Sequence, residues 1–145
     1  MNCKALSIVG LIASVLALAL LLMNHGLLSP APLVIAVQVA AAVLMIWARL
    51  TFGLRSFHAA ANPTEGKLIT HGPYRFIRHP IYSAIVVFVV VGMAANLTLV
   101  NGALGIVVAA GMVTRALCEE RLLRVQYAEY ADYARRTWRM IPLVF

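Results

Sequence analysis

Four long apolar stretches constrain this chain more than any other feature. They run from Ala5 to Met23, from Pro32 to about Ala48, from near Ile81 to about Ala95, and from about Gly102 to Leu117. A membrane-spanning helix needs about 20 mostly apolar residues. The chain is also 63% hydrophobic and only 12% charged, which a soluble domain rarely is. We therefore predict an all-α integral membrane bundle of about four transmembrane helices in a single domain.

The third and fourth apolar stretches are joined by the short connection 96–101, which predicts a tight antiparallel helical hairpin. Small residues let the backbones of membrane helices approach closely. We expect this role in the hairpin for three glycines: Gly92, Gly105 and Gly111.

The segment from about Arg115 to Arg136 follows as one amphipathic helix that leaves the membrane, because its apolar residues share one side. Three tyrosines recur every third residue in it: Tyr127, Tyr130 and Tyr133. We expect packing or an interfacial stripe from them, with a ligand-stacking ladder as the alternative.

All twelve Lys and Arg residues fall on one side of this arrangement, since the connections 24–31 and 96–101 contain none. Cytoplasmic loops carry such a basic excess, so both termini and the middle loop should be cytoplasmic. The middle loop alone carries Arg49, Arg55, Lys67, Arg75 and Arg78. Membrane topology thus explains the net charge of +7, and without a nucleic-acid motif we expect no nucleic-acid partner.

The two cysteines, Cys3 and Cys118, lie near opposite ends of the chain without the spacing of metal ligands. They predict reduced thiols and no disulfide framework.

One polar cluster interrupts the apolar sequence, "HGPYRFIRHPIY" at 71–82. Gly72-Pro73 signals a turn, and Pro80 suits the first turn of the third apolar helix. The cluster should therefore lie at the cytoplasmic mouth of that helix. By themselves Arg75 and Arg78 fit a functional site no better than a basic juxtamembrane segment that binds anionic lipid head groups.

A second cluster, "RALCEERLLR" at 115–124, places Arg115 and Glu119 on one helix face, with Glu120 beside them. An exposed ion pair would stabilise the helix only weakly. Adjacent carboxylates near lipid more often mark a site. The predicted hairpin brings both clusters together, in a pocket that could join a water-soluble cofactor to a lipidic substrate.

These two clusters together resemble the isoprenylcysteine carboxyl methyltransferase family and, more distantly, the phospholipid methyltransferases. The family pattern is G-x-Y-x-x-x-R-H-P-x-Y, then E-E-x-x-L, then Y-x-x-Y-x-x-R and a terminal Pro. The matching residues are Gly72, Tyr74, Arg78, His79, Pro80, Tyr82, Glu119, Glu120, Leu123, Tyr130, Tyr133, Arg136 and Pro142. The resemblance covers about residues 50–142, with no family signal in the first two apolar stretches.

The resemblance implies that S-adenosylmethionine is the cofactor and S-adenosylhomocysteine the product, bound in a pocket that faces the cytoplasm. Residues 1–52 would supply two spans, and 53–145 the cofactor-binding catalytic part. The implied cofactor-binding residues are Gly72, Tyr74, Arg78, His79, Pro80, Tyr82, Glu119 and Glu120. The implied catalytic residues are Arg115, which would hold an acceptor carboxylate, and Glu120.

The expected acceptor is a lipidic or small hydrophobic carboxylate of the prenylcysteine type, methylated at a membrane that we expect to be a prokaryotic inner membrane. An amine acceptor is the first alternative, and Glu120 or His79 would then remove its proton. A membrane NADPH-dependent reductase that shares the H-P-x-Y element is the second. A non-catalytic protein that binds lipid through its basic loop is the third.

Overall fold

The computed structural model describes residues 2–53 and 68–142, so Arg55 and Lys67 of the predicted basic loop lie outside it. The described chain is helical, and its one β-type pairing is the isolated bridge between Ile77 and Trp138. In order, the elements are α1 (Cys3–Met23), α2 (Pro32–Phe52), the 3-10 helix η2 (Gly72–Arg75), α3 (Pro80–Ala95), α4 (Leu99–Gln126) and α5 (Tyr130–Arg136).

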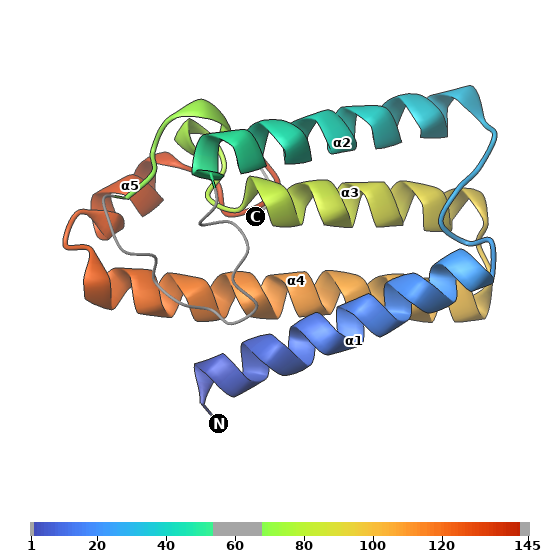
Figure 1. Cartoon of the computed structure of the whole chain (residues 1–145), viewed down its shortest axis with the longest axis horizontal. Coiled ribbons are helices and arrows are strands. Elements are labelled where there is room, and N and C mark those ends of the chain that lie inside the picture. The colour runs from blue at the N-terminus through green and yellow to red at the C-terminus, as the bar shows by residue number, and fades with distance from the viewer. Residues whose placement is uncertain (1, 54–67, 143–145) are drawn as a thin grey trace.

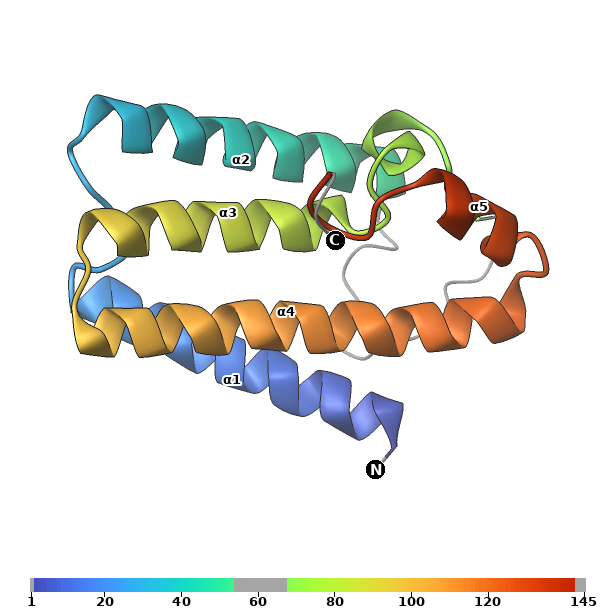
Figure 2. The same ribbon diagram turned by 180° about the vertical axis from the view of Figure 1, so that it is seen from behind.

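The four long helices lie side by side in the order α2, α3, α4, α1 (Figure 1). Successive helices run in opposite directions, and the view from behind shows the same order (Figure 2). The connections 24–31 and 96–98 therefore lie at one end of the bundle, and η2 and α5 at the other. The described basic residues gather at the end that carries η2 and α5, as the sequence predicts.

Within the described residues, three helices are long and apolar enough to cross a bilayer: α1, α2 and α4. The predicted third span, α3, is apolar but has only 16 residues. At 1.5 Å per residue it is about 24 Å long, less than the roughly 30 Å of a hydrocarbon core. With 28 residues α4 is much longer than predicted and extends about 42 Å.

Local sequence signals set most helix starts. Asn2 and Thr98 accept hydrogen bonds from backbone N–H groups in the first turns of α1 and α4. Pro32 and Pro80 are the first residues of α2 and α3, where a missing N–H costs nothing.

The single helix expected over 115–136 is wrong. The chain is extended at Tyr127, between α4 and α5. The break lets α5 turn back toward the start of α3, and its own contacts, described below, hold it there.

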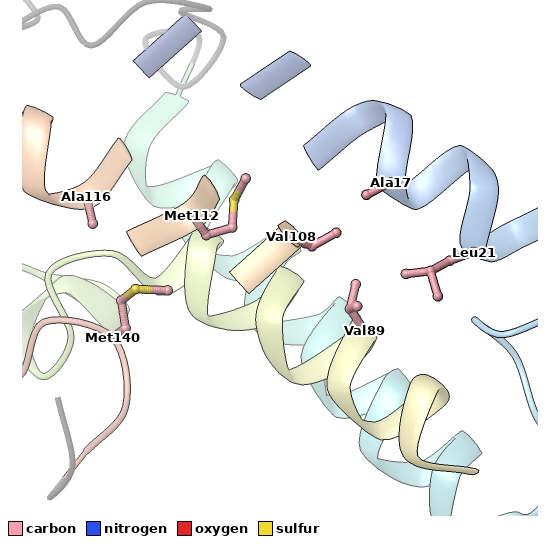
Figure 3. Close-up of a cluster of buried hydrophobic side chains, with 7 residues drawn as sticks. All are labelled: Ala17, Leu21, Val89, Val108, Met112, Ala116 and Met140. Atoms are coloured by element: carbon pink, nitrogen blue, oxygen red, sulfur yellow. The ribbon is translucent and has the colours of Figure 1, made fainter. Parts of the chain in front are cut away.

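The buried core lies among α1, α3, α4 and the segment after α5 (Figure 3). It contains Ala17, Leu21, Val89, Val108, Met112, Ala116 and Met140. In a bilayer such a cluster stabilises by close packing, since lipid is as apolar as the side chains themselves.

The three glycines meet three different neighbours. A Cβ atom at Gly105 would overlap Met93 of α3, which confirms the predicted close approach within the hairpin. At Gly111 it would overlap Ser14 and Gly10 of α1. At Gly92 it would overlap the carbonyl of Leu27. For Gly111 and Gly92 the predicted partner was wrong, because α4 packs mainly on α1 and α3 mainly on α2.

Candidate active site

Residues 71–79 form a short irregular segment between α2 and α3. Gly72 has a φ of 58°, which favours glycine, and a Cβ there would press against Thr51 near the end of α2. The predicted turn at Gly72-Pro73 is therefore confirmed, as the start of η2. Tyr74 is buried, with its ring centroid 5.5 Å from that of Phe52. This segment is thus fixed against the end of α2.

The segment after α5 pairs with the same loop. The Arg78 N–H donates to the Trp138 carbonyl at 2.8 Å, and the His79 N–H to the Arg139 carbonyl at 3.0 Å. In return the Trp138 N–H donates to the Phe76 carbonyl at 2.9 Å. Ser83 Oγ adds a 2.6 Å hydrogen bond to the Met140 carbonyl. Residues 76–79 and 138–140 therefore form one unit, although about sixty positions separate them.

The Glu120 carboxylate, which is almost fully buried, is held by two arginines from these paired segments. Arg78 Nε donates to Oε1 at 2.9 Å. Arg139 donates from Nε to Oε1 at 3.0 Å and from Nη2 to Oε2 at 3.2 Å. A carboxylate this deep needs such partners, because burying an uncompensated charge is costly. Glu120 therefore ties α4 to both segments.

Arg78 has a second set of partners at the end of α5. Its Nη1 donates to the carbonyl oxygens of Ala134, at 2.9 Å, and of Thr137. Terminal helix carbonyls lack partners within their own helix, so this guanidinium supplies them. Tyr133 Oη also donates to the Tyr74 carbonyl at 2.7 Å. These bonds explain why α5 separates from α4.

Glu119 is more open than Glu120, with 24% of its side chain exposed against 4%. Tyr82 Oη donates to its Oε1 atom. Arg115 Nη2 lies 3.8 Å from the same oxygen, at the outer limit of an ion pair. Arg115 itself is buried, donates from Nη1 to the Ser7 carbonyl of α1 at 3.2 Å and lies against the Tyr82 ring.

His79 lies between the two carboxylates. Its Nδ1 is 3.6 Å from Glu119 Oε2 and its Nε2 is 3.4 Å from Glu120 Oε1. Among the described residues Nε2 has no well-aligned hydrogen bond. Burial is the largest influence on the pKa of His79 and lowers it, but the two carboxylates together outweigh burial and raise the pKa above its ordinary value. The ring also stacks on Tyr82 at 5.6 Å.

The tyrosine series points into the protein. Tyr130 is fully buried, Tyr127 is buried, and Tyr133 is partly buried. Burial also raises the pKa values of Tyr130 and Tyr133, so their hydroxyls stay neutral. The packing role expected of these tyrosines is therefore confirmed.

Six side chains thus form one ionic cluster: Arg78, His79, Arg115, Glu119, Glu120 and Arg139. Five of them, and Tyr82 beside them, were singled out from the sequence. Gly72, Tyr74 and Pro80 shape the segment that carries Arg78 and His79, and their role in cofactor binding stays a prediction.

Sequence reasoning missed Arg139 and the carbonyl of Ser7. Membrane topology already explained Arg139 as one of the basic residues on the cytoplasmic side. No sequence signal indicates the pairing of 76–79 with 138–140. A backbone carbonyl has no sequence signature at all.

The comparisons with known proteins give one family. The model of the isoprenylcysteine carboxyl methyltransferase (ICMT) family matches residues 33–125, more than half of the chain. No curated protein and no solved structure matches the chain significantly. The match begins at residue 33, so α2 also carries family signal, contrary to the expectation that the first two apolar stretches carry none.

Proposed function

This chain belongs to the isoprenylcysteine carboxyl methyltransferase family, and from that membership we propose that it methylates a carboxylate on a hydrophobic acceptor, using S-adenosylmethionine. The family makes it a methyltransferase, and its apolar helices suit a membrane environment. Beyond family membership, the proposal names S-adenosylmethionine as the methyl donor and a prenylcysteine-type carboxylate as the acceptor. It also places the reaction at the cytoplasmic side of the membrane.

One observation carries this proposal. Residues from two family motifs, about forty positions apart, meet in a single ionic cluster at the basic end of the bundle. The partial exposure of Glu119, within an otherwise buried cluster, argues for a carboxylate kept available to a ligand.

The residues present fit S-adenosylmethionine. The donor carries an ammonium and a sulfonium, and Glu119 offers a partly exposed carboxylate for positive charge. The donor also carries a carboxylate and a ribose, for which a buried histidine with an unaligned Nε2 is a suitable partner. When bound, S-adenosylmethionine supplies an electrophilic methyl group whose leaving group departs as a neutral thioether.

The protein's own task is then to bind, align and exclude water. We assign Glu119 to cofactor binding and Arg115 to the acceptor carboxylate. Arg115 Nη2 lies 3.8 Å from Glu119 Oε1, at the outer limit of an ion pair, so an acceptor carboxylate can compete for this guanidinium. A carboxylate acceptor needs no general base. Glu120, expected from the sequence to be catalytic, is assigned a positioning role because two arginines already hold it.

The charge balance of the ionic cluster favours an anionic acceptor over an amine. Among the described residues the cluster has three arginines against two glutamates, a surplus of one positive charge before His79 is counted. An approaching ammonium would meet this surplus, whereas a carboxylate would reduce it.

The test is calorimetry of the purified protein with S-adenosylhomocysteine, followed by radioactive methyl transfer to prenylcysteine, fatty-acid and amine-lipid acceptors. We expect saturable nucleotide binding and label only in carboxylate acceptors, as base-labile methyl ester. Label in amines alone would reject the acceptor class. Saturable NADPH binding in place of S-adenosylhomocysteine would support the reductase reading.

A further inference from the structure

α1 and α4 pack antiparallel in a register that continues to the end of the bundle where the ionic cluster lies. Gly10 and Ser14 both lie against Gly111. One turn further toward the N-terminus of α1, the Ser7 carbonyl accepts from Arg115 at 3.2 Å. Residue numbers thus fall along α1 as they rise along α4.

One more turn places Cys3 opposite Cys118, and the side-chain contacts agree. The two thiols lie near each other. Arg121 Nη1, next to them on α4, lies 3.7 Å from Cys3 Sγ. Two cysteines separated by 115 positions therefore meet in space, which the sequence alone did not predict.

The two thiols have unequal access to solvent. Cys3 is partly exposed, whereas Cys118 is buried. A neighbouring guanidinium favours the thiolate, which is the nucleophilic form of cysteine. Cys3 is therefore placed to react first with a water-soluble oxidant. Cys118 is placed to react next with the oxidised Cys3 side chain.

We propose that Cys3 and Cys118 form an oxidisable dithiol, which hydrogen peroxide converts into an intramolecular disulfide beside the ionic cluster. The Cys3 thiolate attacks one peroxide oxygen, the O–O bond breaks, the departing hydroxide takes up the proton that the Cys3 thiol released and leaves as water, and Cys3 becomes a sulfenic acid. Cys118 then attacks the Cys3 sulfur, the S–S bond forms, the S–O bond breaks, and the departing hydroxide takes the Cys118 thiol proton and leaves as a second water. The two thiols lose two protons and two electrons in total, which reduce one peroxide to two waters.

The position of this bond gives it a consequence for the site. Cys118 directly precedes Glu119 on α4, and Ser7, one turn from Cys3 on α1, holds Arg115. Oxidation would therefore fasten together the two helices that carry these contacts. The dithiol itself does not depend on the proposed methyltransferase function.

The test uses the full chain in detergent or nanodiscs, treated with hydrogen peroxide, quenched, denatured and labelled with maleimide-polyethylene glycol. With two cysteines in the chain, each gel shift reports one thiol. We expect both thiols to disappear together in monomeric protein, the intact mass to fall by two hydrogens, and dithiothreitol to restore both.

Variants separate this reaction from unrelated oxidation. Cys3→Ser should leave Cys118 fully labelled, and Arg121→Gln should lose its thiols several-fold more slowly than wild type. Persistent labelling of both wild-type cysteines would overturn the proposal, as would disulfides formed only between two chains. Loss of Cys118 labelling in Cys3→Ser at the wild-type rate would do the same. Activity is not needed for any of these readouts.

Discussion

Arg139 Nε lies 3.0 Å from the Oε1 atom of Glu120, a residue 19 positions earlier in the chain. The bond joins the segment after α5 to the long helix α4, and Arg78 binds the same oxygen from the segment before α3. Three separate parts of the chain therefore depend on one carboxylate.

Removing either partner of this bond should destabilise the protein. Arg139→Ala removes hydrogen bonds to a charged group, which are worth about 1.5–3 kcal/mol. Glu120→Gln leaves arginine charge uncompensated, which costs about 3–5 kcal/mol in buried pairs. Thermal unfolding in detergent measures both, and the double variant should lose less than the sum. The exposed pair of Arg135 with Asp132 provides the control, since Arg135→Ala should change little.

Glu119 and Glu120 should differ in how their substitution affects ligand binding. Glu119→Gln should lower the melting temperature less than Glu120→Gln does, and weaken S-adenosylhomocysteine binding about tenfold or more, because one charge-assisted contact of roughly 1.5–3 kcal/mol is lost. Isothermal calorimetry measures this. Exposed Glu129 is a matched control, and Glu129→Gln should bind as wild type does. Unchanged affinity in Glu119→Gln would remove Glu119 from the proposed site.

Packing between α1 and α4 can be tested at a single glycine. Gly111→Ala places a methyl group against Ser14 and the Gly10 backbone, and overpacking of this kind typically costs about 1–3 kcal/mol. Gly102→Ala on the same helix meets only Leu97 at 3.8 Å, an ordinary contact, and should be neutral or slightly stabilising. Equal melting temperatures for the two variants would show that α1 does not lie where the structure has it.

His79 should couple stability to pH. Its pKa is raised in the folded state by Glu119 and Glu120, so it favours folding most below the unfolded value of about 6.5. This contribution is lost as pH rises through the folded pKa. Melting temperature should therefore fall as pH rises above about 6.5 in wild type, and less in His79→Gln. Parallel curves would contradict the prediction.

Membrane orientation can be checked with single cysteines in a Cys3→Ser, Cys118→Ser background. Ser29→Cys lies in a connection without basic residues, and Arg136→Cys lies near the ionic cluster. In sealed inverted vesicles, where the cytoplasmic face is outside, an impermeant maleimide should label position 136 and spare position 29. Labelling of both positions, or of position 29 alone, would reject the proposed topology.

Local chemistry made much of this fold predictable from the sequence. Pro80 starts α3 and Gly72 turns the chain because each residue restricts or frees its own backbone. The grouping of the basic residues at one end also followed from the apolar stretches. Local rules failed at Tyr127, since no glycine or proline marks the end of α4 there. Distant bonds, from Tyr133 to Tyr74 and from Arg78 to α5, decide that break.

The site was predictable as a set of residues more than as a set of contacts. Glu119 and Glu120 look equivalent in sequence, but in the structure Arg78 and Arg139 cover Glu120, whereas Glu119 stays partly open. In the same way, nothing in the spacing of Cys3 and Cys118 indicates that they meet. Contacts of this kind depend on helix register, which periodicity within one helix does not specify.

The pairing of residues 76–79 with 138–140 also has a consequence for biosynthesis. During translation α3 and α4 are synthesised before Trp138, so their polar ends must wait for residues 138–140. Glu120 and Arg78 therefore meet Arg139 only after that segment has left the ribosome, and a nascent polypeptide stalled earlier would carry both helices without a completed site.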